Sequence, residues 1–348
     1  MKTNKILMVI YNTPPLKSGA AMQALLLFNE LKNNNDIEIL SLDIEKVESD
    51  KYKRIYIGKS LIEKLIKIIY ITYYITFSKY NVIHHISLSK YTYLSVLLSK
   101  LFGKKVISKM TMFGIDDSSI MKRTGLINSI IKNIYKNLDV WIAIAPGMID
   151  DKYNNIRFIP NSVKIPKELP KKSEEVLFLC SGVICERKNQ FAVLNYWELI
   201  QNDKNFLNTK IKLVFIGSYK NDFIEYSKLY IDKFLEKANS FENVEVLGHT
   251  NDVQTYLEKA TYYLSFSTQE GLSNSLLEAL AYSCYPIVYD RDRNVLIKEL
   301  YNYGYYFDDF NNIKVDFFNT KLNNTLLIKN NYSIEVIKQK YLDLYANK

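Results

Sequence analysis

Short apolar runs of strand length recur along this chain, and segments with helical spacing separate them. The predicted strands of the first half are residues 6–10, 37–42, 54–57, 82–86, 105–108, 140–145 and 155–160. Those of the second half are residues 176–180, 211–217, 244–248, 262–267 and 285–289. Strands that alternate with helices favour parallel sheets covered by helices on both faces. The sequence therefore predicts an α/β fold.

A linker divides the chain into two similar halves. Residues 164–173 contain two prolines and several charges, which is typical of a connection between domains. The length of 348 residues is enough for two domains, so we expect one over residues 1–162 and a second over 163–331. A helical pattern closes the chain, and its apolar stripe must be buried somewhere. The stripe consists of Ile334, Val336, Ile337, Tyr341 and Leu344.

The positive charge of the chain lies in its first half. Residues 1–165 carry 24 Lys and Arg against 13 Asp and Glu, a net +11, whereas residues 166–348 carry 22 against 24, a net −2. This asymmetry predicts an anionic partner for the first half: a membrane surface, a phosphorylated acceptor or nucleic acid. Nucleic acid ranks last, because no nucleic-acid motif is present and most aromatic residues lie inside apolar runs.

Residues 61–77 end in a run of ten uncharged residues, 68–77. Ten is well short of the roughly 20 residues that a transmembrane helix requires. The segment could lie in a membrane interface with nearby lysines toward the lipid headgroups, or it could be a helix buried against the sheet. We favour the buried helix, because the run is apolar all round. The lysines in question are Lys59, Lys64, Lys67 and Lys79.

Cysteine usage bears on the compartment. Cys180, Cys185 and Cys284 are odd in number and lack the spacing of metal ligands, which fits a reduced compartment. The first apolar run is too short for a signal peptide and is predicted to be a strand. We therefore expect a cytoplasmic protein, either free or peripheral on the inner face of the plasma membrane.

Residues 270–286 carry the clearest candidates for chemistry. Glu270 and Gly271 precede a helical pattern of leucines, and Glu278 falls on the second turn of that pattern. A helix start favours an anion, and carboxylates accept hydrogen bonds from hydroxyl groups. A nucleotide-sugar has both phosphates and hydroxyls. A surface helix with solvated glutamates explains the two residues equally well.

Arg187 and Lys188 follow a glycine-containing loop at the start of another predicted helix. Arg binds a phosphate through its fork of donors, and Lys binds it as a point charge. Two cations oppose the helix dipole at such a place, so they suggest an anionic partner. A solvated basic helix start is the simpler alternative.

With these residues in hand, the chain resembles the retaining glycosyltransferase family 4 enzymes of glycosyltransferase group 1 along nearly its whole length. Glu270 and Glu278, with seven residues between them, match the signature of that family. Residues 159–163 look like its domain-crossing Ile-Pro-Asn-Gly-Val, and residues 243–248 look like the segment that frames the base. The resemblance implies a GT-B fold: two Rossmann-like domains face across a cleft, and the last helix, 332–348, packs back on the first.

The resemblance also implies roles for residues. The second domain would bind a nucleotide-sugar, most plausibly a UDP-sugar, and the first would bind the acceptor. Glu278 would hold the ribose, Glu270 would contact the donor sugar, and Arg187 and Lys188 would stabilise the charge on the leaving phosphate. The other donor-binding residues that it implies are Gly271, Leu272, Ser273, Asn274, Gly19, Gly248 and His249.

On the acceptor side the chain departs from the family pattern. His84 takes the first place of a His-x-His pattern, but Ile86 holds the second, and Phe113-Gly114 replaces a His-Gly. His84 and Asp116 are the acceptor-side candidates. The alternative for His84 is a structural role, which is the commoner one for a lone histidine at a strand end.

The second half departs from the pattern as well. Gly182 stands where the family often has an arginine, and Ser283 replaces a usual glycine. Residues 290–292, Asp-Arg-Asp, have the spacing of a Mn²⁺ motif of the other large glycosyltransferase fold. Hard cations require several oxygen ligands, and no second acidic cluster accompanies this motif. We expect no metal and no other cofactor.

The expected function is the transfer of a sugar from a nucleotide-sugar to a lipid-linked or polysaccharide acceptor in bacterial cell-surface glycan synthesis. The expected partners are the donor, a glycan or lipid-linked acceptor and an anionic membrane surface, without nucleic acid. Two alternatives share the fold. One is a nucleotide-sugar epimerase, and the other is a non-catalytic subunit that serves a partner enzyme.

Overall fold

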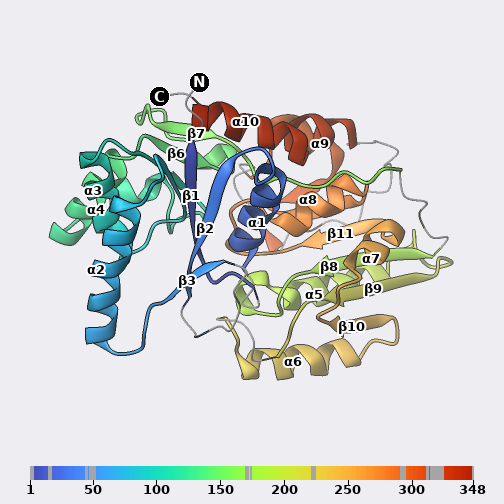
Figure 1. Ribbon diagram of the computed structural model, residues 1–348. Helices are drawn as coiled ribbons and strands as arrows, with labels where there is room; N and C mark the ends of the chain where they lie inside the picture. Colours follow the sequence, from blue (N-terminus) through green and yellow to red (C-terminus); the bar gives the residue numbers. More distant parts are fainter. Residues whose placement is uncertain are drawn as a thin grey trace. The chain divides into compact units, whose positions relative to one another are not determined.

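The computed structural model of the chain describes residues 4–14, 18–43, 46, 52–168, 172, 175–220, 225–290, 295–310, 313 and 325–346. The chain divides into two compact units, whose elements are labelled in Figure 1. Unit 1 consists of Met1–Ser162 and Glu335–Lys348, and unit 2 consists of Val163–Ile334. Each unit holds a parallel sheet with helices packed against it, so the predicted α/β class is confirmed.

The described strands of unit 1 form a seven-stranded parallel sheet in the order β3-β2-β1-β4-β5-β6-β7. The order runs outward in both directions from β1 and β4, so the crossover direction changes between these two strands. Ligands of α/β sheets commonly bind at such a point. The strands are β1 (Lys5–Tyr11), β2 (Asp36–Asp43), β3 (Lys53–Tyr56), β4 (Val82–Ile86), β5 (Lys105–Lys109), β6 (Val140–Ala143) and β7 (Ile156–Phe158).

Helices cover both faces of this sheet, because right-handed crossovers in opposite directions place their helices on opposite sides. Helices α1 (Gly19–Leu31) and α10 (Ile334–Ala346) pack on one face. Helices α2 (Leu61–Phe77), α3 (Tyr93–Leu101) and α4 (Leu126–Lys136) form a layer on the other, in which α3 contacts both neighbours (Figure 1). Two 3-10 turns follow β5 and β6: η1 (Ser118–Lys122) and η2 (Pro146–Met148).

The terminal helix α10 belongs to the core of unit 1. Tyr341 and Tyr345 lie among apolar side chains of β1, β4 and α1. The Tyr345 hydroxyl is hydrogen-bonded to Nδ1 of His84 at 2.8 Å, and Lys105 Nζ donates to the carbonyl of Leu344 at 2.5 Å. The end of the chain therefore completes the unit in which the chain begins.

Helix α2 corrects one prediction. Its start is fixed by a capping box in which Ser60 and Glu63 exchange hydrogen bonds. A narrow stripe that includes Ile71 and Ile75 packs on the sheet, but Ile62 and Ile69 are 71% and 67% exposed. The prediction of a buried helix is therefore wrong, because a helix in a single layer buries only one side, whatever its composition.

The described strands of unit 2 form a six-stranded parallel sheet in the order β10-β9-β8-β11-β12-β13, and the crossover direction changes between β8 and β11. The strands are β8 (Val176–Ser181), β9 (Ile211–Ile216), β10 (Val244–Gly248), β11 (Tyr262–Ser265), β12 (Tyr285–Tyr289) and β13 (Tyr305–Phe307). The helices and 3-10 turns are η3 (Glu186–Lys188), α5 (Gln190–Gln201), α6 (Lys228–Asn239), α7 (Val253–Lys259), α8 (Asn274–Ala281), η4 (Lys298–Tyr303) and α9 (Thr325–Tyr332).

One further difference from the sequence prediction concerns a short element. Strand β13 was not predicted, since three residues are too few for a periodic signal. In the described part of the chain, no helix has both the length and the apolar character needed to cross a bilayer.

Candidate functional site

The topology of unit 2 brings two loops together at the carboxyl edge of its sheet. Strands β8 and β11 are neighbours where the strand order reverses. The loop after β8 contains η3, and the loop after β11 leads into α8. Thr268 N–H donates to the carbonyl of Arg187 at 2.9 Å, and Ser275 Oγ donates to the carbonyl of Ser181 at 3.2 Å. These bonds fix one loop against the other.

Four charged side chains meet at these loops, and we call them the charged cluster. Arg187 donates from Nε and Nη2 to the two oxygens of Glu225, at 2.6 and 2.8 Å, and from Nη1 to Glu270 at 2.8 Å. Arg187 Nη1 also donates to the carbonyl of Gln269 at 3.0 Å. Lys188 Nζ pairs with Glu270. The two cations are therefore neutralised by two carboxylates of the chain itself.

The pairing within the charged cluster keeps its carboxylates ionised. Burial tends to raise the pKa of Glu270, but Lys188 and Arg187 outweigh it, and the pKa is lowered. Hydrogen bonds from Arg187 lower the pKa of Glu225, and the same bonds raise that of Arg187. Glu270, Glu225 and Arg187 therefore carry charge at neutral pH.

Two glycines leave room for Lys188. Gly217 packs so closely on the loop after β8 that an added Cβ would lie 1.8 Å from the carbonyl oxygen of Gly182. Gly182 has a φ of +145°, and an added Cβ there would lie 3.2 Å from Cε of Lys188. Because residue 182 is a glycine, where the resemblance led us to expect an arginine, the side chain of Lys188 has room to extend toward Glu270.

Helix α8 carries the second glutamate of the pair. It begins at Asn274, and the hydroxyl of its N-cap Ser273 is hydrogen-bonded to that of Ser275 at 3.1 Å instead of capping a backbone N–H of the first turn. Glu278 reaches solvent, although neighbouring protein desolvates its carboxyl and raises its pKa. No hydrogen bond or ion pair engages the Glu278 side chain within the described residues. Unlike Glu270, it is therefore available to accept hydrogen bonds from a ligand.

The other donor-side candidates lie near these loops. Gly271 and Leu272 form the buried connection into α8. Strand β10 ends at Gly248, whose carbonyl accepts the N–H of Gly217 at 2.9 Å, and the exposed His249 follows it. The structure thus gathers Glu270, Arg187 and Lys188 into one cluster. Gly248 and His249 lie at the same edge of the sheet.

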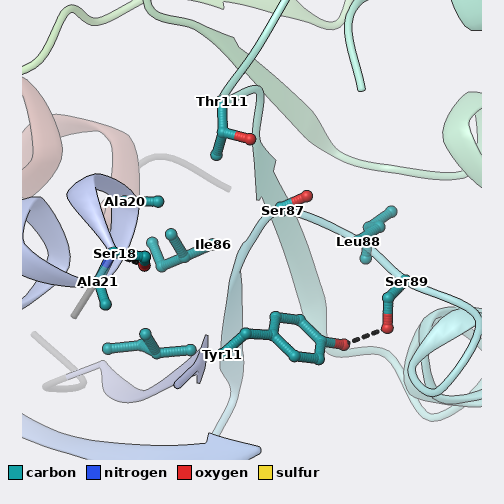
Figure 2. A pocket seen from close by; sticks show the side chains of 10 residues that line it. Tyr11, Ser18, Ala20, Ala21, Ile86, Ser87, Leu88, Ser89 and Thr111 are labelled. Carbon is teal, nitrogen blue, oxygen red and sulfur yellow. Dashed lines mark hydrogen bonds between the residues drawn. The ribbon is translucent and has the colours of Figure 1, made fainter. Parts of the chain in front are cut away.

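A cavity of about 260 Å³ opens at the corresponding edge of unit 1 (Figure 2). Its walls come from the ends of β1 and β4, the start of α1 and the residue Thr111 after β5. The hydroxyl of Tyr11 points to that of Ser89 and is hydrogen-bonded to it (Figure 2). Gly19, the first residue of α1, lies between two of the lining residues. The cavity is thus lined by hydroxyls and small apolar side chains.

The acceptor-side candidates of the sequence lie behind this cavity and are buried. Asp116 accepts the N–H groups of Thr111 and Met112 at 2.8 and 2.9 Å, and burial raises its pKa. Asp116 therefore positions Thr111 at the cavity wall. His84 is fully buried beside Tyr345, and burial lowers its pKa to about 3. Neither residue is part of the cavity lining, and the structural alternative fits His84 better.

The Asp-Arg-Asp motif is only partly described. The carboxylate of Asp290 accepts hydrogen bonds from the hydroxyl of Tyr301 and, at 3.4 Å, from the N–H of Val295. Arg291 and Asp292 lie outside the described residues, as does Asn294. Among the residues that are described, no three His, Cys, Asp or Glu side chains are arranged to hold a metal ion.

Sequence reasoning missed two parts of these sites. Glu225 lies in a polar segment before α6, and no pattern marks it as the partner of an arginine 38 residues earlier. The pair of Tyr11 and Ser89 gives no local signal either. The only available clue is that both residues end or follow strands that are adjacent in the sheet.

Comparison with known proteins supports a relation to sugar-transferring enzymes. Residues 161–314 match the family model glycosyl transferases group 1, which is less than half of the chain and lies almost wholly in unit 2. Over 116 residues the chain is 33% identical to the capsular polysaccharide biosynthesis glycosyltransferase CapH of Staphylococcus aureus, covering 32% of this chain and 30% of CapH.

A second relative comes from Campylobacter jejuni. Over 207 residues the chain is 22% identical to its N-acetylgalactosamine-N,N'-diacetylbacillosaminyl-diphospho-undecaprenol 4-alpha-N-acetylgalactosaminyltransferase, covering 54% of this chain and 52% of that enzyme. The matches thus cover only 30% and 52% of the length of these two curated relatives.

Solved structures show the fold of the whole chain. Anabaena Alr3699/HepE, in complex with UDP and glucose, has a TM-score of 0.72 at 12% identity and covers 99% of this chain and 100% of its own. TarM has a TM-score of 0.66 at 14% identity, with coverage of 100% and 99%. At these identities the likeness is one of fold alone. The predicted GT-B class, with two Rossmann-like domains, is confirmed.

Proposed function

We propose that this protein is a glycosyltransferase that moves a sugar from a nucleotide-sugar to a glycan or lipid-linked acceptor in bacterial cell-surface glycan synthesis. The observation that carries the proposal is the charged cluster next to the start of α8, within the stretch that matches the family model. A UDP-sugar is the donor to test first, because Alr3699/HepE was solved with UDP and glucose.

In this proposal the charged cluster receives the donor diphosphate. Arg187 already uses four N–H groups on Glu225, Glu270 and Gln269. A diphosphate that binds here therefore competes with Glu270 and Glu225 for Arg187 and Lys188. Glu278, which has no hydrogen-bond or ion-pair partner among the described residues, accepts hydrogen bonds from the ribose hydroxyls, since an ionised carboxylate makes stronger hydrogen bonds than a neutral acceptor.

The proposed reaction retains the configuration at the anomeric carbon. The bond between that carbon and the donor phosphate oxygen breaks, and a bond to the acceptor hydroxyl oxygen forms on the same face. The acceptor proton passes to the departing phosphate, so the products are a nucleoside diphosphate and the extended glycan. Arg187 and Lys188 stabilise the negative charge that develops on the phosphate, which is the kind of preorganised electrostatics that contributes most to catalysis.

The cavity of unit 1 is the proposed acceptor site. The hydroxyls of Tyr11, Ser87, Ser89 and Thr111 are suited to a sugar, because each both donates and accepts hydrogen bonds. The name of the C. jejuni relative contains a diphospho-undecaprenol, and CapH is named for capsular polysaccharide biosynthesis. These names support a lipid-linked or polysaccharide acceptor here.

Glu278→Gln tests the donor site. The variant keeps the shape of the side chain but removes the charge that strengthens its hydrogen bonds, so UDP-sugar affinity measured by calorimetry is expected to fall roughly tenfold. Glu236→Gln is the matched control, because Glu236 is an exposed acid on α6 and its loss is expected to leave affinity unchanged. Equal affinity of the Glu278 variant and the wild type excludes Glu278 from the donor site.

Metal independence is a separate proposal. Transfer is expected to continue in excess EDTA, because in this proposal Arg187 and Lys188 neutralise the donor phosphates in place of a metal ion. The measurement is product formation with and without EDTA. If EDTA abolishes product formation and Mn²⁺ restores it, this proposal is wrong and Asp290 is again a candidate metal ligand.

Donor binding without any transfer to added acceptors favours the non-catalytic alternative.

A further inference from the structure

The outer side of the helical layer of unit 1 is apolar. Among the described residues, large apolar side chains that are more than a third exposed gather on α2, on α3 with its C-cap, and on α4. On α2 they form an outward stripe at helical spacing, with Ile62, Ile66, Ile69, Tyr73 and Phe77 spaced by three or four residues. On α4, Leu126 and Ile127 are 82% and 73% exposed. We call these side chains together the apolar face.

The three helices that carry the apolar face pack side by side. Helix α3 packs on both α2 and α4. The ring of Phe77 on α2 lies 5.0 Å from that of Phe102, the C-cap of α3, and also 5.0 Å from that of Tyr73. Helix α2 alone extends for roughly 26 Å. An exposed apolar surface of this extent is rare on a protein without a partner.

The charge of these helices selects the kind of partner. The sequences of α2, α3 and α4 contain five lysines and one acid, Glu63, whose carboxylate already caps α2. One of the five, Lys100, forms an ion pair with Asp139 at 2.5 Å, which leaves four to act on a partner. A second copy of the same face would bring like charges together, which is unfavourable. An anionic surface is complementary to the lysines. Tyr70 and Tyr73 add the amphipathic rings that favour membrane interfaces.

We infer that the apolar face binds the surface of an anionic lipid bilayer, with α2 and α4 lying in the interface. The inference rests on the proposed function in one respect, since a lipid-linked acceptor would be found at that surface. Apolar contacts and lysine charges act together, so attachment is only partly sensitive to salt. Lys64 and Lys67 are the relevant cations. Lys79 is not among them, because it forms an ion pair with Glu38 at 3.0 Å.

Vesicle flotation tests the inference. Wild-type protein is expected to float with phosphatidylglycerol vesicles, to remain below phosphatidylcholine vesicles, and to be released only in part by high salt. The triple variant Ile66→Gln/Ile69→Gln/Tyr73→Gln is expected to lower the partition coefficient by about tenfold or more at every salt concentration. These side chains are exposed, so the variant is expected to fold.

Two further variants separate the contributions. Lys64→Gln/Lys67→Gln is expected to weaken flotation several-fold at low salt and to have little effect at high salt. The control Leu199→Gln/Leu229→Gln removes exposed apolar side chains from α5 and α6 of unit 2 and is expected to change nothing.

Three results overturn the inference. They are no flotation with anionic vesicles at low salt, an equal loss in the unit 2 control, and a wild-type dimer that the triple variant converts to a monomer without any lipid binding. Donor affinity is measured by calorimetry on the same samples. Intact donor binding without flotation overturns only this inference, whereas absent donor binding counts against the proposed function.

Discussion

The partners of Arg187 decide how the candidate donor site behaves at the scale of single residues. Glu225 accepts hydrogen bonds from two nitrogens of the guanidinium group, Nε and Nη2. Glu270 and the carbonyl of Gln269 accept hydrogen bonds from the third, Nη1. Paired carboxylates keep Arg187 in one orientation, but they also compete with any phosphate. Since the Glu225 side chain is 40% exposed, its competition is screened in part by solvent.

Glu225→Gln is expected to tighten UDP binding several-fold. The substitution removes a negative charge next to the proposed diphosphate position and frees part of the Arg187 fork. The measurement is the Kd for UDP by calorimetry at low and moderate salt, with Glu236→Gln as the control for net charge. Weaker binding in the Glu225 variant contradicts this view and assigns Glu225 the role of orienting Arg187.

Residue types that carry chemistry were predictable, but their pairing was not. The spacing of Glu270 and Glu278 and the position of Arg187 and Lys188 after a loop indicated a site in the second half. Nothing in the sequence showed that Glu270 pairs with both cations, or that Glu278 has no hydrogen-bond or ion-pair partner among the described residues. That difference depends on how two loops pack, and Glu225 enters from a third.

Strand β4 carries an acid-sensitive element. His84 and His85 are fully buried, and burial lowers the pKa of each to about 3. In the unfolded chain a histidine titrates near 6.5, so below that pH the unfolded state binds protons that the folded state does not. The stability that the two neutral histidines contribute to unit 1 is therefore complete above about pH 6.5 and is lost progressively as the pH falls from there toward 3.

Urea unfolding at pH 7.5 and 5.5 measures this loss. Each histidine contributes about 1.4 kcal/mol per pH unit below 6.5, so the pair is expected to lower the free energy of unfolding by roughly 3 kcal/mol at pH 5.5. In His85→Leu only one histidine remains, and the decrease is expected to be about half as large. An unchanged decrease in that variant means that other groups cause the acid sensitivity.

The positions of helices and strands in the sequence were easier to predict than which side of each helix is buried. Apolar runs bounded by turn residues identified β1, β4, β8 and β11, because a strand that is buried on both faces of the sheet has a nearly continuous apolar sequence. The same apolar character led to the wrong prediction for α2. Its sequence offers apolar side chains to every direction, so only the position of the sheet determines that Ile71 is buried and Ile69 is exposed.

On the scale of the whole molecule, the chain ends in the unit where it begins. Tyr341 on α10 is 1% exposed and lies 5.5 Å from the ring of His84 and 5.9 Å from that of Tyr345. The stability of unit 1 therefore depends on the last residues of the sequence, whereas the proposed donor site belongs to unit 2. Substitutions and ligands can thus be directed at one unit at a time.

Scanning calorimetry is expected to separate the two effects. Tyr341→Ala removes a buried aromatic side chain and is expected to destabilise unit 1 by roughly 3–5 kcal/mol. UDP at a hundred times its Kd is expected to stabilise unit 2 by about 2.7 kcal/mol, because it binds only the folded site.

Phe234→Ala, which removes a fully buried ring from unit 2, is the matched control. It is expected to lower the midpoint temperature of the same unfolding transition whose midpoint UDP raises. If Tyr341→Ala lowers the UDP-sensitive transition as much as Phe234→Ala does, the two units unfold as one cooperative body and the separate assignment of their stabilities is wrong.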